Sequence, residues 1–254
     1  MLHIRPIQKG DLDILTQIVR DVWEMDSLCG SEEAGRYLSN EYLIKTLNYS
    51  TSAQVAVMDG QIAGLVAIRE GEKLPPFSFE REKAPAGLGQ KEIQTMRDHM
   101  TEYDRSCQKL LQDSGYEFEG EITLLAVSPS SQGHGIGVKL FEKAKEQFGH
   151  RRFFLYTDTS CHYQFYDHRG MKCLAKKQKE NPYRKKAAFL LFYMEANEQK
   201  WKRLGFYLEF PTAMCLVKGE LSGKDRLMKF KNNYILFRFF LCYENKLEKS
   251  PLKK

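Results

Sequence analysis

The chain has 254 residues, 42% of them apolar, which allows one large domain or one domain with an appendage. Aromatic residues at 12%, charged residues at 28% and only 8 prolines exclude a disordered, collagen-like or low-complexity chain, because such chains bury too little apolar surface to offset ordering entropy. The net charge of +6 is uneven, since residues 197–254 carry +7 and the rest carries −1. No groove-binding motif accompanies this basic segment, so we expect no nucleic-acid partner.

The six cysteines lie far apart and form no C-x-x-C pair, which predicts reduced thiols and no metal site. They are Cys29, Cys107, Cys161, Cys173, Cys215 and Cys242. The N-terminus, MLHIRPIQKGDLD, lacks the apolar segment of a secretory signal, so we expect a cytoplasmic protein. The apolar stretch 234–243 would cover only about 15 Å as a helix, roughly half of a bilayer core, and predicts no membrane span.

Hydrophobic spacing predicts an alternation of strands and helices in the first half of the chain. Asp59, Gly60 and Gln61 separate two β-rich runs and predict a hairpin, because Asp-Gly supplies the positive φ that tight turns need. The expected elements are strand 2–6, helix 9–23, loop 24–30, helix 31–47, strands 54–58 and 62–68, an irregular stretch 70–90 and helix 91–114. The apolar stripe of the last helix is typical of a packed face.

The second half is expected to alternate in the same way. It comprises strand 122–127, a turn over 128–137 followed by a helix, strand 153–158, a short helix 162–168, and strands 171–175 and 187–194 joined by a basic loop 176–186. Gly170 is a helix-stop residue. Beyond residue 196 the periodicity degrades.

The turn between the strand and the helix is rich in glycine, and such a turn directs backbone N–H groups and a helix dipole at one spot that can bind phosphate. A Walker loop requires Lys-Ser or Lys-Thr after its last glycine, whereas Gly137 is followed by Val138, Lys139 and Leu140. A dinucleotide fingerprint requires G-x-G-x-x-G, whereas this turn reads G-x-G-x-G. Asp158 lies about where a dinucleotide-binding fold has its ribose-binding acid, but the spacing of the glycines disfavours a dinucleotide site.

The pattern Q-x-x-G-x-G from Gln132 to Gly137, after LLAVSP and before an amphipathic helix, resembles the acyl-CoA diphosphate loop of the GNAT acetyltransferase superfamily. The segment FYDHRGM at 165–171 is similar to that family's F-Y-x-x-x-G-F, with Met171 in place of the usual aromatic residue. The order of elements over residues 2–194 agrees as well. Two motifs at a compatible separation in the right element order make this resemblance specific.

The resemblance implies an α/β fold: a central mixed sheet of about seven strands flanked by helices, with a helical insertion between strands 3 and 4. It implies a domain over 1–196 and leaves 197–254 as a C-terminal extension. It also implies acetyl-CoA as co-substrate and no metal. The backbone of Leu125, Ala126 and Val127 would bind the pantetheine arm, and the amides of Gln132, Gly133, His134, Gly135, Ile136, Gly137 and Val138 would bind the diphosphate.

For catalysis the resemblance assigns to Tyr166 the protonation of the leaving thiolate, although a buried tyrosine with a satisfied hydroxyl is the plainer reading. Glu117, Glu119 and Glu121 alternate into the strand before the turn and should share one face. The resemblance makes Glu121 the best-placed base, with Asp158 second, although these acids could equally be the solvated charges of an ordinary strand end. His162 and His134 are the remaining titratable candidates.

The expected function is transfer of an acetyl group from acetyl-CoA to a primary amine of a small molecule or a peptide. The segment 23–33, with Asp26, Glu32 and Glu33, and the insertion 70–120 would frame the acceptor, although these acids could equally be solvated surface charges. The alternative is a non-catalytic acyl-CoA-binding or adaptor protein whose basic tail contacts nucleic acid or a membrane surface. Two other roles for residues 197–254 stay open, an extra packing element and a contact in a homodimer.

Overall fold

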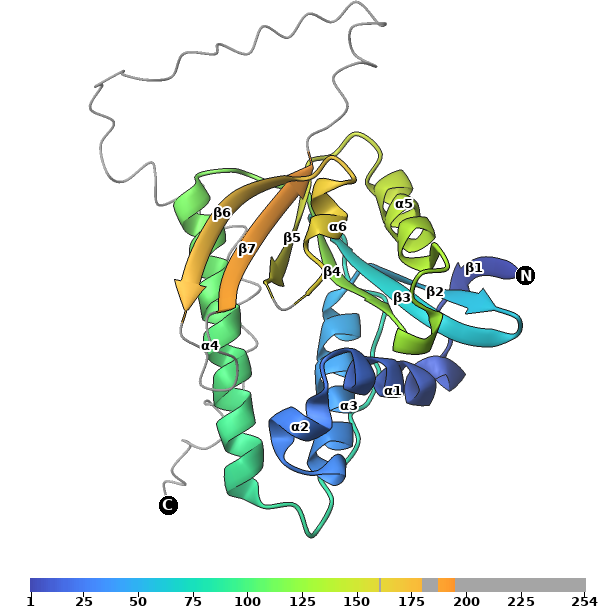
Figure 1. The fold of residues 1–254 in the computed structure, drawn as a ribbon, viewed down its shortest axis with the longest axis vertical. Coiled ribbons are helices and arrows are strands. Elements are labelled where there is room, and N and C mark those ends of the chain that lie inside the picture. Colours follow the sequence, from blue (N-terminus) through green and yellow to red (C-terminus); the bar gives the residue numbers. More distant parts are fainter. Residues whose placement is uncertain (160, 180–186, 195–254) are drawn as a thin grey trace, which may run out of the picture. The chain divides into compact units, whose positions relative to one another are not determined.

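One seven-stranded sheet with helices on both faces organises residues 1–159, 161–179 and 187–194, which are those that the computed structural model describes (Figure 1). Its strands are β1 (Leu2–Pro6), β2 (Ser52–Met58), β3 (Gln61–Glu70), β4 (Gly120–Val127), β5 (Phe153–Asp158), β6 (Lys172–Lys179) and β7 (Ala187–Met194). Its helices are α1 (Leu12–Val22), α2 (Met25–Cys29), α3 (Glu32–Tyr49), α4 (Gln90–Ser114), α5 (Ile136–Phe148) and α6 (Gln164–Asp167), with 3-10 turns at Lys9–Asp11 and Pro129–Ser131.

The strands run in the order β1-β2-β3-β4-β5-β7-β6. All neighbours are antiparallel except β4 and β5, which are parallel and joined by the crossover helix α5. The expected mixed seven-stranded sheet and the helical insertion between its third and fourth strands are therefore confirmed.

Alternating side chains of the strands form two apolar layers, as the two-residue period of a strand requires. Val66 and Ile68 of β3 face α5 and join a core centred on Phe141 and Phe148. Leu65 and Ala67 face the other side and join a core with α1 and α3. Each helix layer thus packs against one face of the sheet.

An extra residue in β4 separates this strand from β5. Ile68 pairs with Ile122 and Ala67 with Leu124, so Thr123 is a β-bulge. The described ladder between β4 and β5 consists only of the pairs Gly120 with Phe153 and Glu121 with Phe154. Beyond Glu121 the two strands diverge, and the edge of β4 that faces β5 has no described strand partner.

Helix α4 lies on the same face of the sheet as α1 and α3, beside β6 and β7 (Figure 1). Near its start, Ile93 and Met96 pack with residues of α2 and α3. Near its end, Leu110 packs with Phe154 of β5 and Leu191 of β7. The expected packing role of its apolar stripe is confirmed.

Several boundaries differ from those expected. The loop predicted at 24–30 contains α2, because Arg20 of α1 binds Asp26 and holds the segment in place. The basic loop predicted at 176–186 is wrong in its first part: β6 continues to residue 179, where pairing with β7 orders a lysine-rich edge strand. The helix predicted at 162–168 is limited to α6, and the one at 9–23 starts with a 3-10 turn.

The predicted boundary between a domain at 1–196 and an extension at 197–254 lies outside the described residues. Across the part of the chain that the structure describes, no helix combines the length and apolarity needed to cross a bilayer.

Gly64 of β3 is the tightest point between β3 and β4, because a Cβ there would lie 2.6 Å from the backbone oxygen of Ala126. We expect Gly64→Ala to lower the free energy of unfolding by about 1–3 kcal/mol, since the two strands would have to shift apart. Chemical denaturation measures this change, with Gly10→Ala as control because a Cβ at Gly10 meets nothing within 4 Å. Equal stability of the two variants would contradict the close approach.

Candidate active site

The turn after β4 has backbone donors that can face an anion, although the N–H of Gln132 donates to the carbonyl of Pro129 at 3.4 Å. Gly133 and Gly135 have φ of +81° and +73°, a region that strains residues with a Cβ. Gly135 is the N-cap of α5, which has no side-chain cap and no acidic residue in its first turn. The N–H groups at the start of α5 and the positive end of its dipole are therefore not neutralised by the helix's own first turn.

The structure brings the seven predicted diphosphate-binding residues into this single turn. Gln132, Gly133, His134 and Gly135 are exposed, and Gln132 Nε2 donates to the carbonyl of Val127 at 3.4 Å. The ring nitrogen Nδ1 of His134 lies 3.3 Å from the carbonyl oxygen of Ser131. The side chain of Ile136 is buried in the core, so only its backbone N–H is available to a diphosphate. Gly137 and Val138 are partly exposed.

The predicted pantetheine-binding residues lie on the unpaired edge of β4. Leu125, Ala126 and Val127 pair with β3 on one side, opposite Val66, Leu65 and Gly64. Ala126 is buried against the α1 and α3 layer, whereas Leu125 and Val127 pack toward α5. Their side chains are thus core residues, while their strand has one edge available to an extended ligand.

Glu121 lies where β4 leaves β5, on the face covered by α3. The hydroxyl of Tyr49, the last residue of α3, donates to Glu121 Oε2 at 3.3 Å. The Arg69 guanidinium lies 5.1 Å from the centre of the Tyr49 ring and donates to the Tyr49 carbonyl at 3.0 Å. Arg69 is also the cross-strand partner of Glu121, so a hydroxyl binds this carboxylate and a cation lies on the neighbouring strand.

Burial raises the pKa of Glu121 to about 7, and the negative charge of Asp104 adds to the rise. The hydrogen bond from Tyr49 and the charge of Arg69 act in the opposite direction and lower it. Desolvation is the largest cause, so the carboxyl exchanges its proton near neutral pH. A group with this property suits proton transfer.

Tyr166 of α6 packs on the α5 side of the sheet. Its ring lies 5.8 Å from that of Phe192, 6.3 Å from Phe141 and 5.2 Å from Phe165, measured between ring centres. Burial raises the pKa of Tyr166, which keeps the phenol protonated. Within the described part of the chain its hydroxyl has no hydrogen-bond partner, unlike the satisfied hydroxyl of a structural tyrosine.

The other acidic candidates are placed differently. Glu117 and Glu119 precede β4 and are exposed, and Glu119 accepts a hydrogen bond from the backbone N–H of Arg152 at 3.2 Å. The prediction that both share one face of the strand with Glu121 is therefore wrong. Asp26 accepts two bonds from Arg20, at 2.6 and 2.7 Å, and Glu32 lies 3.7 Å from the same guanidinium. These bonds assign Asp26 an anchoring role. Glu33 is exposed.

The remaining candidates lie around the end of β5. Asp158 is the last residue of that strand, and its charge raises the pKa of Tyr103 and Cys107 on α4. His162 is exposed in the segment that leads to α6.

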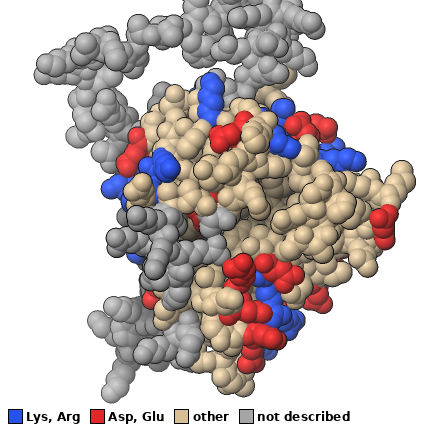
Figure 2. Space-filling model, in the orientation of Figure 1, with Lys and Arg blue, Asp and Glu red and all other residues tan. Residues whose placement is uncertain are grey.

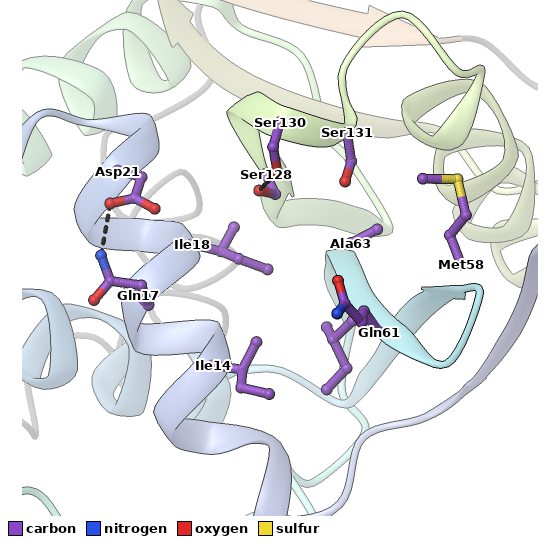
Figure 3. Close-up of a pocket in the computed structure, with 11 residues that line it drawn as sticks. Ile14, Gln17, Ile18, Asp21, Met58, Gln61, Ala63, Ser128, Ser130 and Ser131 are labelled. Carbon is purple, nitrogen blue, oxygen red and sulfur yellow. Dashed lines mark hydrogen bonds between the residues drawn. The ribbon is translucent and has the colours of Figure 1, made fainter.

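A cavity of about 260 Å³ lies between α1, the β2–β3 hairpin and the turn after β4 (Figure 3). Ser128, Ser130 and Ser131 line one side, and the Asp21 carboxylate opposite accepts from Gln17 Nε2 at 2.6 Å. Neither Glu121 nor Tyr166 lines it. Acidic side chains mixed with basic ones also gather over α1 and α2 (Figure 2), and the bond between Arg20 and Asp26 belongs to this region.

No group of three or more His, Cys, Asp or Glu side chains in the described ranges has an arrangement that could hold a metal ion. The sequence interpretation did not identify Tyr49 and Arg69 as parts of the site. The available signal is the arginine that directly follows the apolar run 62–68, but its meaning depends on the register that places it opposite Glu121.

Because folding raises the pKa of Glu121, the folded chain binds this proton more tightly than the unfolded chain between about pH 4.5 and 7. Stability is therefore lost as the pH rises through this window. We expect Glu121→Gln to gain roughly 2–3 kcal/mol relative to the native chain between pH 5 and 8. Urea denaturation at both pH values measures the gain. Glu117→Gln serves as the exposed control, and a pH-independent difference for Glu121→Gln would contradict the raised pKa.

The comparisons with known proteins agree with this fold. The profile of the acetyltransferase (GNAT) family matches residues 16–171, more than half of the chain. A search of curated protein sequences found no match. A solved structure described as histone acetyltransferase HPA2 and related acetyltransferase, from Corynebacterium glutamicum, is 13% identical with a TM-score of 0.51, over 77% of this chain and 97% of that one.

Two further solved structures are similar. NAA60 of Arabidopsis thaliana, solved with a bisubstrate analogue, is 16% identical with a TM-score of 0.47 over 76% of this chain and 97% of its own. An N-acetyltransferase of Staphylococcus aureus is 13% identical with a TM-score of 0.43 over 77% and 98%. At these identities the structural likeness concerns the fold alone, whereas the profile match is decisive: the chain belongs to the GNAT acetyltransferase family.

Proposed function

We propose that the chain is an N-acetyltransferase that moves an acetyl group directly from acetyl-CoA to a primary amine of a small molecule or a peptide, in the cytoplasm. The observation that carries the proposal is the open edge of β4, which ends in a turn of exposed backbone donors. One extended thioester with a diphosphate at its far end fits both features, because its amides can pair with a strand edge and its phosphates with a helix N-terminus.

The chain's own contribution to donor binding is mostly backbone. Leu125, Ala126 and Val127 present the free edge of β4, and Gly133 and Gly135 allow the N–H groups of the turn to converge. A Cβ built on Gly137 would lie 3.5 Å from Phe165 and 3.6 Å from Val127, which is ordinary contact. Protein packing therefore does not demand glycine at this position, whereas close approach of a ligand to the helix start would.

Transfer requires a proton to leave the ammonium of the acceptor. Glu121 accepts it, directly or through one water, since its carboxyl is half ionised near pH 7. The amine nitrogen then bonds to the acetyl carbon while the carbon–sulfur bond breaks. The proton held by Glu121 afterwards passes to solvent.

The departing thiolate must gain a proton or a strong hydrogen bond. Tyr166 supplies it, because burial keeps its phenol protonated and its hydroxyl has no hydrogen-bond partner among the described residues. The amide nitrogen formed in the transfer loses its second proton, which through water restores the phenol. The net products are an acetamide, coenzyme A and one released proton.

A non-catalytic acyl-CoA-binding or adaptor protein remains the competing function. Such a protein needs the open strand edge and the glycine turn, but it needs neither a carboxyl that titrates near neutrality nor a phenol without a partner among the described residues. The presence of both favours catalysis. The basic segment 197–254 on which the adaptor function rests lies outside the described residues.

Two measurements on the purified chain test the proposal. Calorimetry should detect binding of coenzyme A, and release of free thiol from acetyl-CoA should depend on an added amine. Binding without amine-dependent thiol release would support the acyl-CoA-binding protein instead. No binding would exclude both functions.

We expect Tyr166→Phe to lower kcat by about 10- to 100-fold, because the leaving thiolate loses its proton donor. The affinity for coenzyme A should change less than about twofold, since the aromatic packing of the ring is kept. Assays of thiol release give kcat, and calorimetry gives the affinity for coenzyme A. Tyr163→Phe, a neighbouring hydroxyl deletion, is the control, and an unchanged kcat in Tyr166→Phe would remove the assigned role.

We expect Tyr49→Phe to move the acid limb of the kcat/KM profile to higher pH by about one unit. The hydrogen bond from Tyr49 favours the ionised form of Glu121, so its loss raises the pKa of this carboxyl further above about 7. The profile is recorded from pH 5.5 to 9 with saturating acetyl-CoA. Tyr116→Phe, at an exposed tyrosine, should leave the limb in place, and a shift toward lower pH in Tyr49→Phe would contradict the arrangement.

A further inference from the structure

Arg169 follows α6 in the turn that leads to β6, and among the described residues its charge has no acidic partner. Its one side-chain hydrogen bond there is long, since Nη1 donates to the carbonyl of Phe165 at 3.5 Å. Its Nε is the one buried side-chain nitrogen or oxygen in the described ranges that lacks a hydrogen-bond partner. A buried donor without a partner costs free energy, so the stability of the fold does not explain an arginine here.

Stacking on an aromatic ring holds the guanidinium of Arg169 in place. Its central carbon lies 4.1 Å from the centre of the Phe165 ring, where the ring face attracts the cation. This contact uses the flat side of the guanidinium, and the N–H groups lie in its plane, so they stay available to another acceptor. Arg169 is partly exposed, and its Nη2 has no partner among the residues that the structure describes. The arginine is therefore a positioned cation with unused donors.

The ring of Phe165 also contacts the start of α5. A Cβ built on Gly137 would lie 3.5 Å from Phe165 Cε2, at the edge of the ring. The ring meets that of Phe141 in α5 edge-on at 5.9 Å between centres, and α5 and α6 lie side by side on this face of the sheet (Figure 1). One aromatic ring thus separates the guanidinium of Arg169 from the turn that we propose for the diphosphate.

A cation at this place suits a second phosphate on the same ligand. Coenzyme A carries one on the 3′ oxygen of its ribose, and a single sugar ring separates it from the diphosphate. Because the sugar and the aromatic ring are of similar size, a diphosphate bound by the turn leaves the 3′-phosphate within reach of Arg169. The planar N–H groups of an arginine can form two parallel hydrogen bonds with phosphate oxygens.

From these contacts we propose that Arg169 binds the 3′-phosphate of the donor and makes the chain selective for thioesters of coenzyme A. Thioesters of dephospho-coenzyme A, and those on the phosphopantetheine arm of a carrier protein, lack this phosphate. The inference rests on the proposed function and adds a specificity-determining residue to its donor site. Arg169 acts through binding alone, because the 3′-phosphate lies at the end of the donor opposite to the thioester.

The first test compares coenzyme A with dephospho-coenzyme A on the full-length native chain by calorimetry. The two ligands differ only in the 3′-phosphate. We expect coenzyme A to have a Kd lower by about tenfold or more, because hydrogen bonds between a guanidinium and a phosphate are charge-assisted. Equal Kd values would overturn this inference and leave the proposed function standing. Binding of neither ligand would overturn both.

The second test assigns the preference to Arg169. The variant Arg169→Met keeps an unbranched chain against Phe165 but removes the charge and the unpaired Nε. We expect its preference for coenzyme A to fall to about twofold or less, with an unchanged Kd for dephospho-coenzyme A and a Tm no lower than that of the native chain. The KM for acetyl-CoA should rise about tenfold at constant kcat.

Arg105→Met is the matched control, because Arg105 is an exposed arginine of α4 on the opposite face of the sheet. It should keep the native preference. Thermal melts establish that each variant is folded, and Arg169→Gln replaces Arg169→Met if the latter does not fold. A native preference in the folded variant would overturn the assignment. An equal loss of affinity for both ligands would also overturn it, because Arg169 would then act on a part that the two ligands share.

Discussion

The separation of β4 from β5 beyond Glu121 is the constraint on which the rest of the molecule depends. A sheet gains most from continuous pairing, and here six residues of a central strand lack a described partner on one side. The bulge at Thr123 turns the strand away, and the hydroxyls of Ser50 and Thr123, 2.7 Å apart, tie the bulge to the end of α3. The backbone groups on an internal strand edge of this kind cost free energy unless water or an extended ligand forms hydrogen bonds with them. The edge of β4 is therefore a feature of the fold and of the proposed donor site at once.

The same divergence determines the electrostatics of Glu121. Its carboxyl lies at the last paired position, next to Tyr49 of α3 and opposite Arg69 of β3, and burial there favours its protonated form. Arg69 and Tyr49 oppose this effect but do not cancel it. The result is a group whose charge changes near neutral pH, close to the strand edge where a thioester would lie. Position and proton affinity therefore have the same structural origin.

Local periodicity and glycine predict the strands, the turn and the inserted helix. The family resemblance adds their arrangement in one mixed sheet and the proposed roles of Tyr166 and Glu121. Tyr49 and Arg69 were not predictable, because their roles arise from the pairing of Arg69 with Glu121 across fifty residues of chain. Glu117 and Glu119 were expected to share the face of Glu121, and they do not, since β4 starts only at Gly120. Residues at alternate positions share one face of a sheet only if they all lie within the strand.

Helix α4 shows how packing and chemistry can use one segment. Its apolar stripe predicted core packing, and Ile93, Met96 and Leu110 confirm it at both ends. Its middle turn also contacts α3, through the ion pair between Lys45 and Asp104, and β7, through the ring contact between Tyr103 and Phe189. The described ladder between β4 and β5 has only two pairs, so strand pairing alone joins the two halves of the sheet weakly. The inserted helix adds a second connection between these halves, and the opening beside β4 is kept at no cost to the rest of the sheet.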